Sequence, residues 1–596
     1  MDTAALEVVV LLGTAVWGLT LLARRLRVPP PIVLLLGGVP LAFVPALDGV
    51  HLEPALVLFI FLPALLYAES LDVSLNEIRA NLRVVILSAV GLVVATAAAV
   101  AWIGHSLGLS WPVAWVLGAV LAPTDATAVA AVAGRMPRRQ LTILRAESLI
   151  NDGTALVILG IAVEVATGHD GVGAGGIAGD FLISYGGGLA VGLAAGWLNV
   201  RARGWIHDTL LSNTVSVLTP FVAFLAAEEI HASGVLGAVV AGLYVSQAGS
   251  LIITAQDRVR ARQFWQLTSF LLNGTLFVLV GLELRTAVSD LTSYPIGTAV
   301  LDTLLVAAAV IGTRLVWTNT TPYVVRLLDR RPQQRARRVP FRQRQPGAWS
   351  GFRGAVSLAA ALSIPSGVPG RDLIIIVTFG VIAITLGVQG LTLPAVLRWA
   401  KLPPDTSEDE YAYTERRAID LALELLPREA ARLRVEDEIA DLVRAELRES
   451  RAELDGPDTD HVIPDEQEIA DEGMGMAGPD DSGNGDSRDG GRVLRSGDQG
   501  PRASGRGPRS GDREPRAGGR GPSGGDRGPD GGDREPGGRS RREQYRELRL
   551  ALVAEKRRAV VRMRDGKRID DLVARRFESL LDAEELRLGA ETTPTD

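Results

Sequence analysis

The chain has 596 residues and contains no cysteine, and its only lysines are Lys401, Lys556 and Lys567. The lack of cysteine excludes disulfides, thiol nucleophiles and thiolate metal sites. Because no lysine precedes residue 401, a permanent positive charge buried before that point must belong to an arginine, which keeps its proton. The few histidines fall at the edges of apolar segments, in loops or in the tail: His51, His105, His169, His207, His231 and His461. Proton binding inside the apolar segments is therefore left to carboxylates.

Apolar residues make up 47% of the chain and charged residues 22%, and the two kinds are unevenly distributed. Up to about residue 400 the chain is a series of apolar segments near the length that crosses the ~30 Å hydrocarbon layer of a membrane. We expect thirteen spans, at residues 4–23, 31–46, 54–70, 82–107, 111–134, 144–167, 177–200, 209–229, 232–248, 263–283, 296–325, 350–366 and 371–400. The pattern predicts an all-α polytopic membrane protein.

Arginines indicate the orientation of these spans. They gather after the first, fifth, seventh, ninth and eleventh spans, whereas the opposite loops carry only Arg285 and Arg371. Positive charge accumulates in cytoplasmic loops. We therefore expect the N-terminus outside, the C-terminal tail in the cytoplasm and the protein in the plasma membrane.

Composition divides the chain into four regions: a transmembrane domain at 1–400, amphipathic cytoplasmic helices at 401–455, a linker at 456–538 and a helical segment at 539–596. The linker is rich in Gly, Arg, Pro and Asp and has almost nothing apolar, a composition that cannot bury a core and predicts disorder. Its acids alternate with its arginines and it lacks aromatics for stacking, which argues against nucleic-acid binding. We expect the last segment to dock on the membrane domain or on a second copy of itself.

Few polar residues lie within the apolar segments, where charge is costly and points to function. They are Asp125 in the fifth span, Glu147, Ser148, Asn151 and Asp152 in the sixth, Arg314 in the eleventh and Arg353 in the twelfth, whereas Glu283 and Asp302 lie nearer the ends of their spans. On a helix, Glu147 and Asn151 are four residues apart, as are Ser148 and Asp152, so the two pairs line adjacent strips of one face. The alternative is that Glu147 and Ser148 only cap a helix entry, which fits Asp152 poorly because it lies deeper.

The stretch Pro123-Thr124-Asp125 predicts a break in the fifth span, since proline removes a backbone donor. Thr124 or Asp125 is then a helix N-cap, and the same break presents unpaired backbone groups to a cavity, as transporters do at their ion sites. Thr124 offers a carbonyl and Asp125 a carboxylate. Asp152, supported by Asp125, is the expected carrier, because a proton and a metal cation would compete for one buried carboxylate.

The thirteen spans also divide into two sets of six around the seventh, and the two sets have opposite orientation. In this scheme the fifth span pairs with the twelfth, which contains GFRGAVS and ends in SIPSGVPG. Both can be broken by glycine or proline. Matched interrupted segments in inverted halves indicate a transporter site.

Five motifs resemble the monovalent cation:proton antiporters, in particular the electroneutral sodium/proton exchangers of the bacterial NhaP-like type: FLPALLYAESLDV (61–73), LAPTDATAVAAV (121–132), ESLINDGTALV (147–157), GTLFVLVGLEL (274–284) and WSGFRGAVSLAAALSIP (349–365). The resemblance implies a thirteen-helix inverted-repeat fold in which a core domain with crossed, unwound helices moves against a dimerisation domain. The sequence departs from the family pattern at Ala126, where proline is usual, and at Phe352, where leucine is usual.

The resemblance also implies roles for individual residues. Asp152 is the ion- and proton-binding carboxylate, assisted by Ser148, Asp125 and the Thr124 carbonyl. Glu147 pairs with Arg314 with support from Asn151, and Arg353 belongs to the second broken helix. Asn151 in place of a second aspartate resembles the electroneutral branch, and it removes one titratable group.

These observations predict a homodimeric antiporter that exchanges Na⁺ for H⁺ in pH and sodium homeostasis. We expect that it is not an enzyme, that it needs no cofactor and that membrane lipid surrounds it. K⁺ or Li⁺ remains an alternative cation. A tail-regulated cation channel would keep the site without exchange. An intramembrane aspartyl protease using Asp125 and Asp152 would leave the inverted repeat, Asn151 and Arg314 unexplained.

Overall fold

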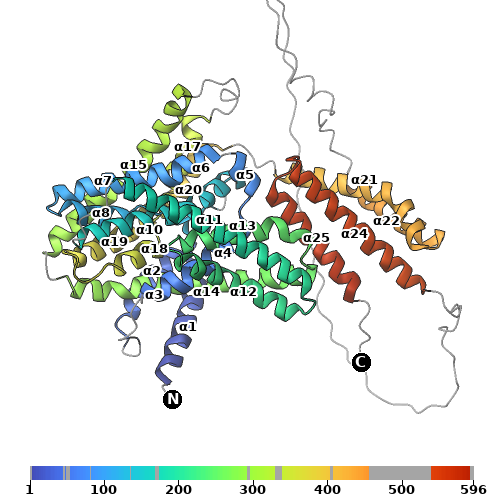
Figure 1. The fold of residues 1–596 in the computed structure, drawn as a ribbon, viewed down its shortest axis with the longest axis horizontal. Coiled ribbons are helices and arrows are strands. Elements are labelled where there is room, and N and C mark those ends of the chain that lie inside the picture. The colour runs from blue at the N-terminus through green and yellow to red at the C-terminus, as the bar shows by residue number, and fades with distance from the viewer. Residues whose placement is uncertain are drawn as a thin grey trace, which may run out of the picture. The chain divides into compact units, whose positions relative to one another are not determined.

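The computed structural model describes residues 3–44, 47, 54–80, 82–133, 136–167, 174–291, 295–328, 339–402, 407–454 and 539–590. Over these residues every regular element is a helix and no β-strand forms (Figure 1). The predicted all-α fold class is confirmed. The segment at 456–538, predicted to be disordered, lies outside the described residues.

The first six predicted spans correspond to helices α1 to α10. Their bounds are α1 Thr3–Leu26, α2 Pro30–Leu41, α3 Pro54–Leu56, α4 Leu62–Asp72, α5 Leu75–Ala80, α6 Leu82–Ile86, α7 Val93–Ser106, α8 Trp111–Leu121, α9 Ala126–Val132 and α10 Arg138–Ala166. Wider π-helical turns at Val57–Phe61 and Leu87–Leu92 join α3 to α4 and α6 to α7. Each joined pair therefore forms one continuous span.

The other seven predicted spans correspond to helices α11 to α20. Their bounds are α11 Ala174–Trp205, α12 Thr209–Glu228, α13 Gly234–Ala248, α14 Ala255–Ser289, α15 Ile296–Leu328, α17 Phe341–Trp349, α18 Ala355–Leu362, α19 Arg371–Ile384 and α20 Gly390–Ala400. A π-helical turn at Thr385–Gln389 joins α19 to α20.

Among the described residues, ten helices are long and apolar enough to cross a membrane, and eleven if α8 and α9 are taken as one span bent by 40°. The two other predicted spans are the 12-residue α2 and the broken pair α17 and α18. The twelfth span begins at Phe341, earlier than residue 350 as predicted, because its first helix, FRQRQPGAW, is too polar to be recognised by hydropathy.

The membrane helices pack in two groups. In one, α11, α12 and α13 pack together, α13 contacts α4, and α14 contacts α2. In the other, α8 packs on α7 and α10, while α15 packs on α7 and α19. The short α18 contacts both α8 and α19. This arrangement brings the fifth, sixth and twelfth spans together inside the second group.

The tail contains four described helices, α21 Ser407–Leu433, α22 Asp437–Leu454, α24 Arg541–Asp565 and α25 Asp571–Ala590 (orange and red in Figure 1). They bury two small apolar cores of their own. Ile419, Leu426 and Val443 meet Leu548 in one, and Val560, Phe577 and Leu581 gather in the other. The predicted helical segments on either side of the linker therefore form one helical unit.

Candidate functional site

The break between α8 and α9 is built by Pro123 and Asp125. Proline carries no N–H, so the helix cannot continue through it with full hydrogen bonding. Asp125 then starts α9 as its N-cap, and its Oδ1 accepts hydrogen bonds from the amides of Thr127 (2.9 Å) and Ala128 (3.0 Å). One carboxylate oxygen, Oδ1, is used by the cap, and the other, Oδ2, accepts no hydrogen bond from a described residue.

A second break separates α17 from α18 at residues 350–354, and Arg353 lies in it. The Arg353 guanidinium is 1% exposed and donates to the carbonyl oxygens of Ala122 and Pro123 in the first break. Its amide donates to Thr385 Oγ1 at 3.2 Å. A helix that ends inside a membrane leaves carbonyls that must find partners within the protein. The guanidinium of Arg353 is the hydrogen-bond donor for two of these carbonyls.

The two breaks also touch through their backbones. The amide of Asp125 donates to the carbonyl of Phe352 at 2.9 Å. A Cβ added to Gly354 would lie 2.1 Å from Asp125 Oδ2, so only glycine permits this approach. The crossing of two interrupted helices is thus held by direct contacts at the carboxylate itself.

Helix α10 presents Ser148 and Asn151 to the first break. Ser148 Oγ donates to the Thr124 carbonyl at 2.6 Å and accepts from the amide of Ala126 at 3.2 Å. Asn151 Nδ2 donates to Thr124 Oγ1 at 2.6 Å. The sequence predicts that Asn151 supports the pair Glu147 and Arg314. The hydrogen bond that its side chain forms in the structure goes to Thr124 in the first break. The buried Oδ1 of Asn151 has no hydrogen-bond partner among the described residues.

Asp152 lies one residue further along α10 and is 4% exposed. No described residue forms a hydrogen bond with its carboxylate. The charged groups that act on it are Glu69, Asp125 and Arg353. A buried carboxylate without a permanent partner can hold either a proton or a cation, since each neutralises it.

Glu147, also on α10, forms a buried ion pair with Arg314 of α15. Arg314 Nη1 lies 2.7 Å from Glu147 Oε1, and the two side chains are 4% and 7% exposed. Arg314 Nε also donates to the Gly347 carbonyl of α17 at 3.2 Å. The pair joins α10, α15 and α17, which is a structural contribution within the second helix group.

Glu69 is a further acidic residue near the site that sequence reasoning did not nominate. Its Oε1 accepts from Thr127 Oγ1 at 2.5 Å, and Thr127 is the residue whose amide binds Asp125. Glu69 was overlooked because it lies at the end of a predicted span, where an acid normally meets water. The break in the fifth span brings α9 beside it. A signal was present, since Glu69 is the lone acid in FLPALLYAES.

The site offers oxygen atoms to a small hard cation. Among the described residues no three His, Cys, Asp or Glu side chains converge as metal ligands. The ion ligands predicted from the sequence are the carboxylates of Asp152 and Asp125, the Ser148 hydroxyl and the Thr124 carbonyl, and the last two are joined by their 2.6 Å hydrogen bond. A mixed, partly neutral oxygen shell of this kind suits reversible binding of a monovalent ion.

Comparison with known proteins identifies the family. A family model described as "Sodium/hydrogen exchanger, transmembrane" matches residues 9–399. The chain belongs to the sodium/hydrogen exchanger family. The match contains both broken helices and α10, and the chain is accordingly a multi-pass membrane protein of a cation/proton exchanger family.

Individual relatives agree with this assignment. An uncharacterized Na⁺/H⁺ exchanger of Mycobacterium tuberculosis is 43% identical over 466 residues, which cover 76% of this chain and 86% of that protein. The Na⁺/H⁺ antiporter ApNhaP of Aphanothece halophytica is 30% identical, with 67% and 74% covered. The structure of the sodium proton antiporter MjNhaP1 from Methanocaldococcus jannaschii superimposes with a TM-score of 0.54 at 18% identity, covering 67% of this exchanger and all of that chain. The two proteins share the fold.

Proposed function

We propose that this exchanger moves one Na⁺ against one H⁺ across the plasma membrane by alternating access, with Asp152 as the carrier of both ions. The observation that carries the proposal is the Asp152 carboxylate, which is buried at the crossing of two broken helices and has no hydrogen-bond partner among the described residues. Such a group must be neutralised in every state of the cycle.

One carrier explains a stoichiometry of one for one. Asn151, the neighbour of Asp152, carries no charge and cannot release a proton. Asp125 is committed to capping α9 through Oδ1, and Glu147 is committed to Arg314. If Asp152 alone exchanges its proton for a cation, its carboxylate is neutralised by Na⁺ on the way in one direction and by H⁺ on the way back. No net charge then crosses the membrane in a cycle.

The division of the helices into two groups supports alternating access. The site residues belong to α8, α9, α10 and the α17–α18 break, all in the group that contains α7, α15 and α19. Movement of this group against α4, α11, α12, α13 and α14 would carry the site from one side to the other. In this scheme the N-terminus is outside, the tail is cytoplasmic, the protein is a homodimer and its role is pH and sodium homeostasis.

Reconstituted transport tests the proposal. Acid-loaded proteoliposomes with an internal pH-sensitive dye would receive Na⁺, K⁺ or Li⁺, with and without a clamp on the membrane potential. We expect Na⁺ to restore internal pH at a rate that the clamp does not change. Recovery with K⁺ or Li⁺ alone would replace the cation and keep the mechanism. A clamp-sensitive rate would contradict the one-for-one stoichiometry, and a current without coupled proton movement would show a channel.

A further inference from the structure

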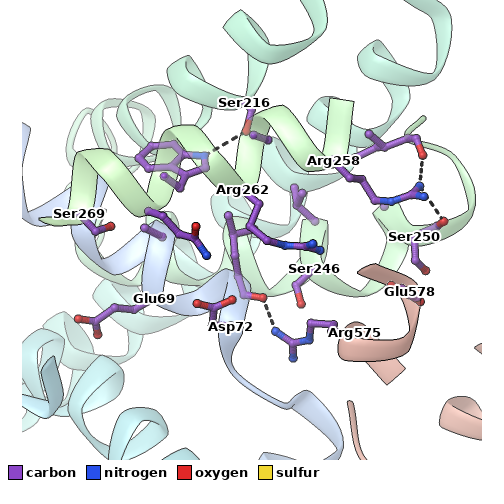
Figure 2. Close-up of a pocket in the computed structure, with 18 of the residues that line it drawn as sticks. Glu69, Asp72, Ser216, Ser246, Ser250, Arg258, Arg262, Ser269, Arg575 and Glu578 are labelled. Carbon is purple, nitrogen blue, oxygen red and sulfur yellow. Dashed lines mark hydrogen bonds between the residues drawn. The ribbon is translucent and has the colours of Figure 1, made fainter. Parts of the chain in front are cut away.

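A cavity of about 360 Å³ lies beside Glu69 and contains polar atoms without protein partners. Among the described residues, Arg203 Nη2, Ser246 Oγ, Ser250 Oγ and Glu578 Oε1 are buried, unbonded and part of its lining residues. Buried polar groups of this kind are normally satisfied by water. The lining of the cavity, drawn in Figure 2, is therefore suited to hold water.

Two hydrogen bonds connect this cavity to Asp125. Glu69 and Thr127 both line it, and they are joined by their 2.5 Å hydrogen bond. The amide of Thr127 in turn binds Asp125 Oδ1. The other lining residues include arginines at helix ends that the charge distribution assigns to the cytoplasm, such as Arg203, Arg258 and Arg262. The cavity thus has the position of the inner entrance to Asp152.

The C-terminal helix α25 forms one wall of this entrance through Arg575 and Glu578. Arg575 donates to the backbone carbonyls of Leu71 and Val73, at the end of α4, and the Asp72 carboxylate acts on it from the same turn. Figure 2 shows Arg575 reaching from α25 toward Asp72, with Glu69 further along the same side of the cavity. A permanent guanidinium charge therefore stands among the acids that an entering cation would meet.

Asp571 fastens the beginning of α25 to the membrane domain. Its carboxylate, completely buried, accepts from Ser74 Oγ (3.1 Å), the Asn76 amide (2.9 Å), Asn76 Nδ2 (2.8 Å) and Gln247 Nε2 (3.2 Å). Ser74 and Asn76 belong to the connection from α4 to α6 and α7, which links the two helix groups. One tail side chain thus holds the connection that must flex if the groups move.

Further along α25, two contacts hold the helix on α14. Arg258 of α14 forms an ion pair with the fully buried Asp582 carboxylate, and Arg262 Nη1 donates to Ser579 Oγ at 2.7 Å. These contacts and those of Asp571 and Arg575 extend over three turns of one face of α25. The opposite face, including Phe577 and Leu581, packs within the tail unit.

We propose that α25 is a built-in lid on the cytoplasmic entrance, in which Arg575 acts as a tethered cation that obstructs the path to Glu69 and Asp571 latches the helix to the connection between the helix groups. This inference rests on the proposed exchange function. In the docked state the entering cation meets Arg575, and the connection at Ser74 and Asn76 is held. Exchange then requires α25 to leave, so that the tail sets the rate.

Full-length point variants test the lid. We expect Arg575→Ala and Asp571→Asn to increase the initial rate of cation-driven proton movement several-fold. Arg576→Ala is the matched control, because Arg576 is the next residue on the same helix, is exposed and binds Glu408 of the tail at 2.7 Å, outside the cavity. Rates equal to wild type, or lower, in properly folded Arg575→Ala and Asp571→Asn would overturn the proposal.

The absence of cysteine permits a direct lock on the lid. Ser74→Cys combined with Asp571→Cys would place the only two thiols where a hydrogen bond now joins the side chains. We expect transport to be slow after oxidation to the disulfide and fast after reduction, with each single variant insensitive to both treatments. An oxidised double variant that transports as fast as its reduced form would contradict the lid.

A measurement that needs no transport separates failure of the lid from failure of the exchange function. Ala130 lines the cavity, and Ala130→Cys can be labelled by a positively charged, membrane-impermeant methanethiosulfonate. We expect labelling to become several-fold faster when Arg575→Ala or Asp571→Asn is added and to stay unchanged with Arg576→Ala. Equal labelling in all backgrounds would reject the lid even if no background transported ions.

Discussion

The backbone amide of Asp125 donates a hydrogen bond to the carbonyl oxygen of Phe352 at 2.9 Å, which joins the breaks of two helices that are more than two hundred residues apart in the sequence. Each break supplies what the other lacks. Arg353 satisfies the carbonyls freed at Ala122 and Pro123, and Asp125 receives its position from the second break. The unwound backbone of each break is thus stabilised by hydrogen bonds from the other.

Gly354→Ala should disable the site by steric means. The added methyl group would lie 2.1 Å from Asp125 Oδ2, so either the carboxylate or the α18 break has to move. We expect exchange to fall severely while the protein still inserts and purifies. Gly347→Ala is the control, since a Cβ there meets nothing within 4 Å. Normal exchange by Gly354→Ala, measured in proteoliposomes, would contradict the described crossing.

Glu147→Ala should lower stability more than it changes the ion chemistry. It leaves the Arg314 guanidinium buried and without its carboxylate, a loss that typically costs about 3–5 kcal/mol. We expect a clearly lower Tm of the purified protein in detergent. Removing both charges, with Glu147→Leu and Arg314→Leu together, should recover part of that loss. A single variant as stable as wild type would show that the ion pair contributes little.

Arg353→Met should damage both stability and transport, because its guanidinium bridges the two breaks. The carbonyls of Ala122 and Pro123 would lose their donor, and each buried unsatisfied group costs about 1–3 kcal/mol. We expect a lower Tm and strongly reduced exchange, with Arg353→Lys in between because lysine keeps the charge without the fork-shaped set of donors. Wild-type behaviour of Arg353→Met would remove this residue from the site.

Docking of α25 should weaken as pH rises. Burial is the main cause that raises the pKa of Glu578 above 4.5 in the docked helix, and Asp582 raises it further, against the opposing effects of Arg564, Arg258 and Arg557. A carboxyl whose docked pKa is raised stabilises docking fully below 4.5 and loses that contribution as pH rises through the docked value. Nitroxide labels at residues 130 and 580 would report the separation. We expect the distance between the two labels to depend less on pH in Glu578→Gln than in wild type. An equally steep pH dependence in Glu578→Gln would show that other groups cause it.

Deletion of residues 456–538 should leave the exchange rate nearly unchanged. The described tail helices on both sides, α21 with α22 and α24 with α25, share apolar cores, so the unit can form from two separate parts of the chain. The measurement is the initial rate of cation-driven proton movement in proteoliposomes. Complete loss of exchange, with the protein still folded, would show that the linker does more than connect these helices.

Hydropathy placed most of the spans, because a membrane requires about 20 apolar residues wherever the chain crosses it. It missed the polar start of the twelfth span at Phe341. In the fifth span local chemistry leads further: Pro123 predicted the break, and the N-cap was predicted at Thr124 or Asp125, of which the structure uses Asp125. Partners distant in sequence were less accessible. Asn151 binds Thr124 in the structure, and nothing in the spacing of ESLIND distinguishes that partner from Arg314.

Two features escaped prediction because they depend on tertiary packing. Glu69 becomes part of the site only when the bent fifth span brings Thr127 to α4. Asp571, in a charged tail segment, has no sequence signature that separates it from its acidic neighbours, and its latch exists only because Ser74, Asn76 and Gln247 meet around it. A hydropathy pattern assigns residues to a membrane and leaves such pairings undetermined.

Na⁺-driven proton movement by Asp152→Asn decides whether Asp152 carries both ions. Wild type and Asp302→Asn, which neutralises a different acid within a span, should both restore the internal pH of acid-loaded proteoliposomes. Asp152→Asn should purify as a folded protein and show no Na⁺-dependent recovery at any pH tested. Recovery by Asp152→Asn at the wild-type rate would contradict the account and move the carrier to another carboxylate.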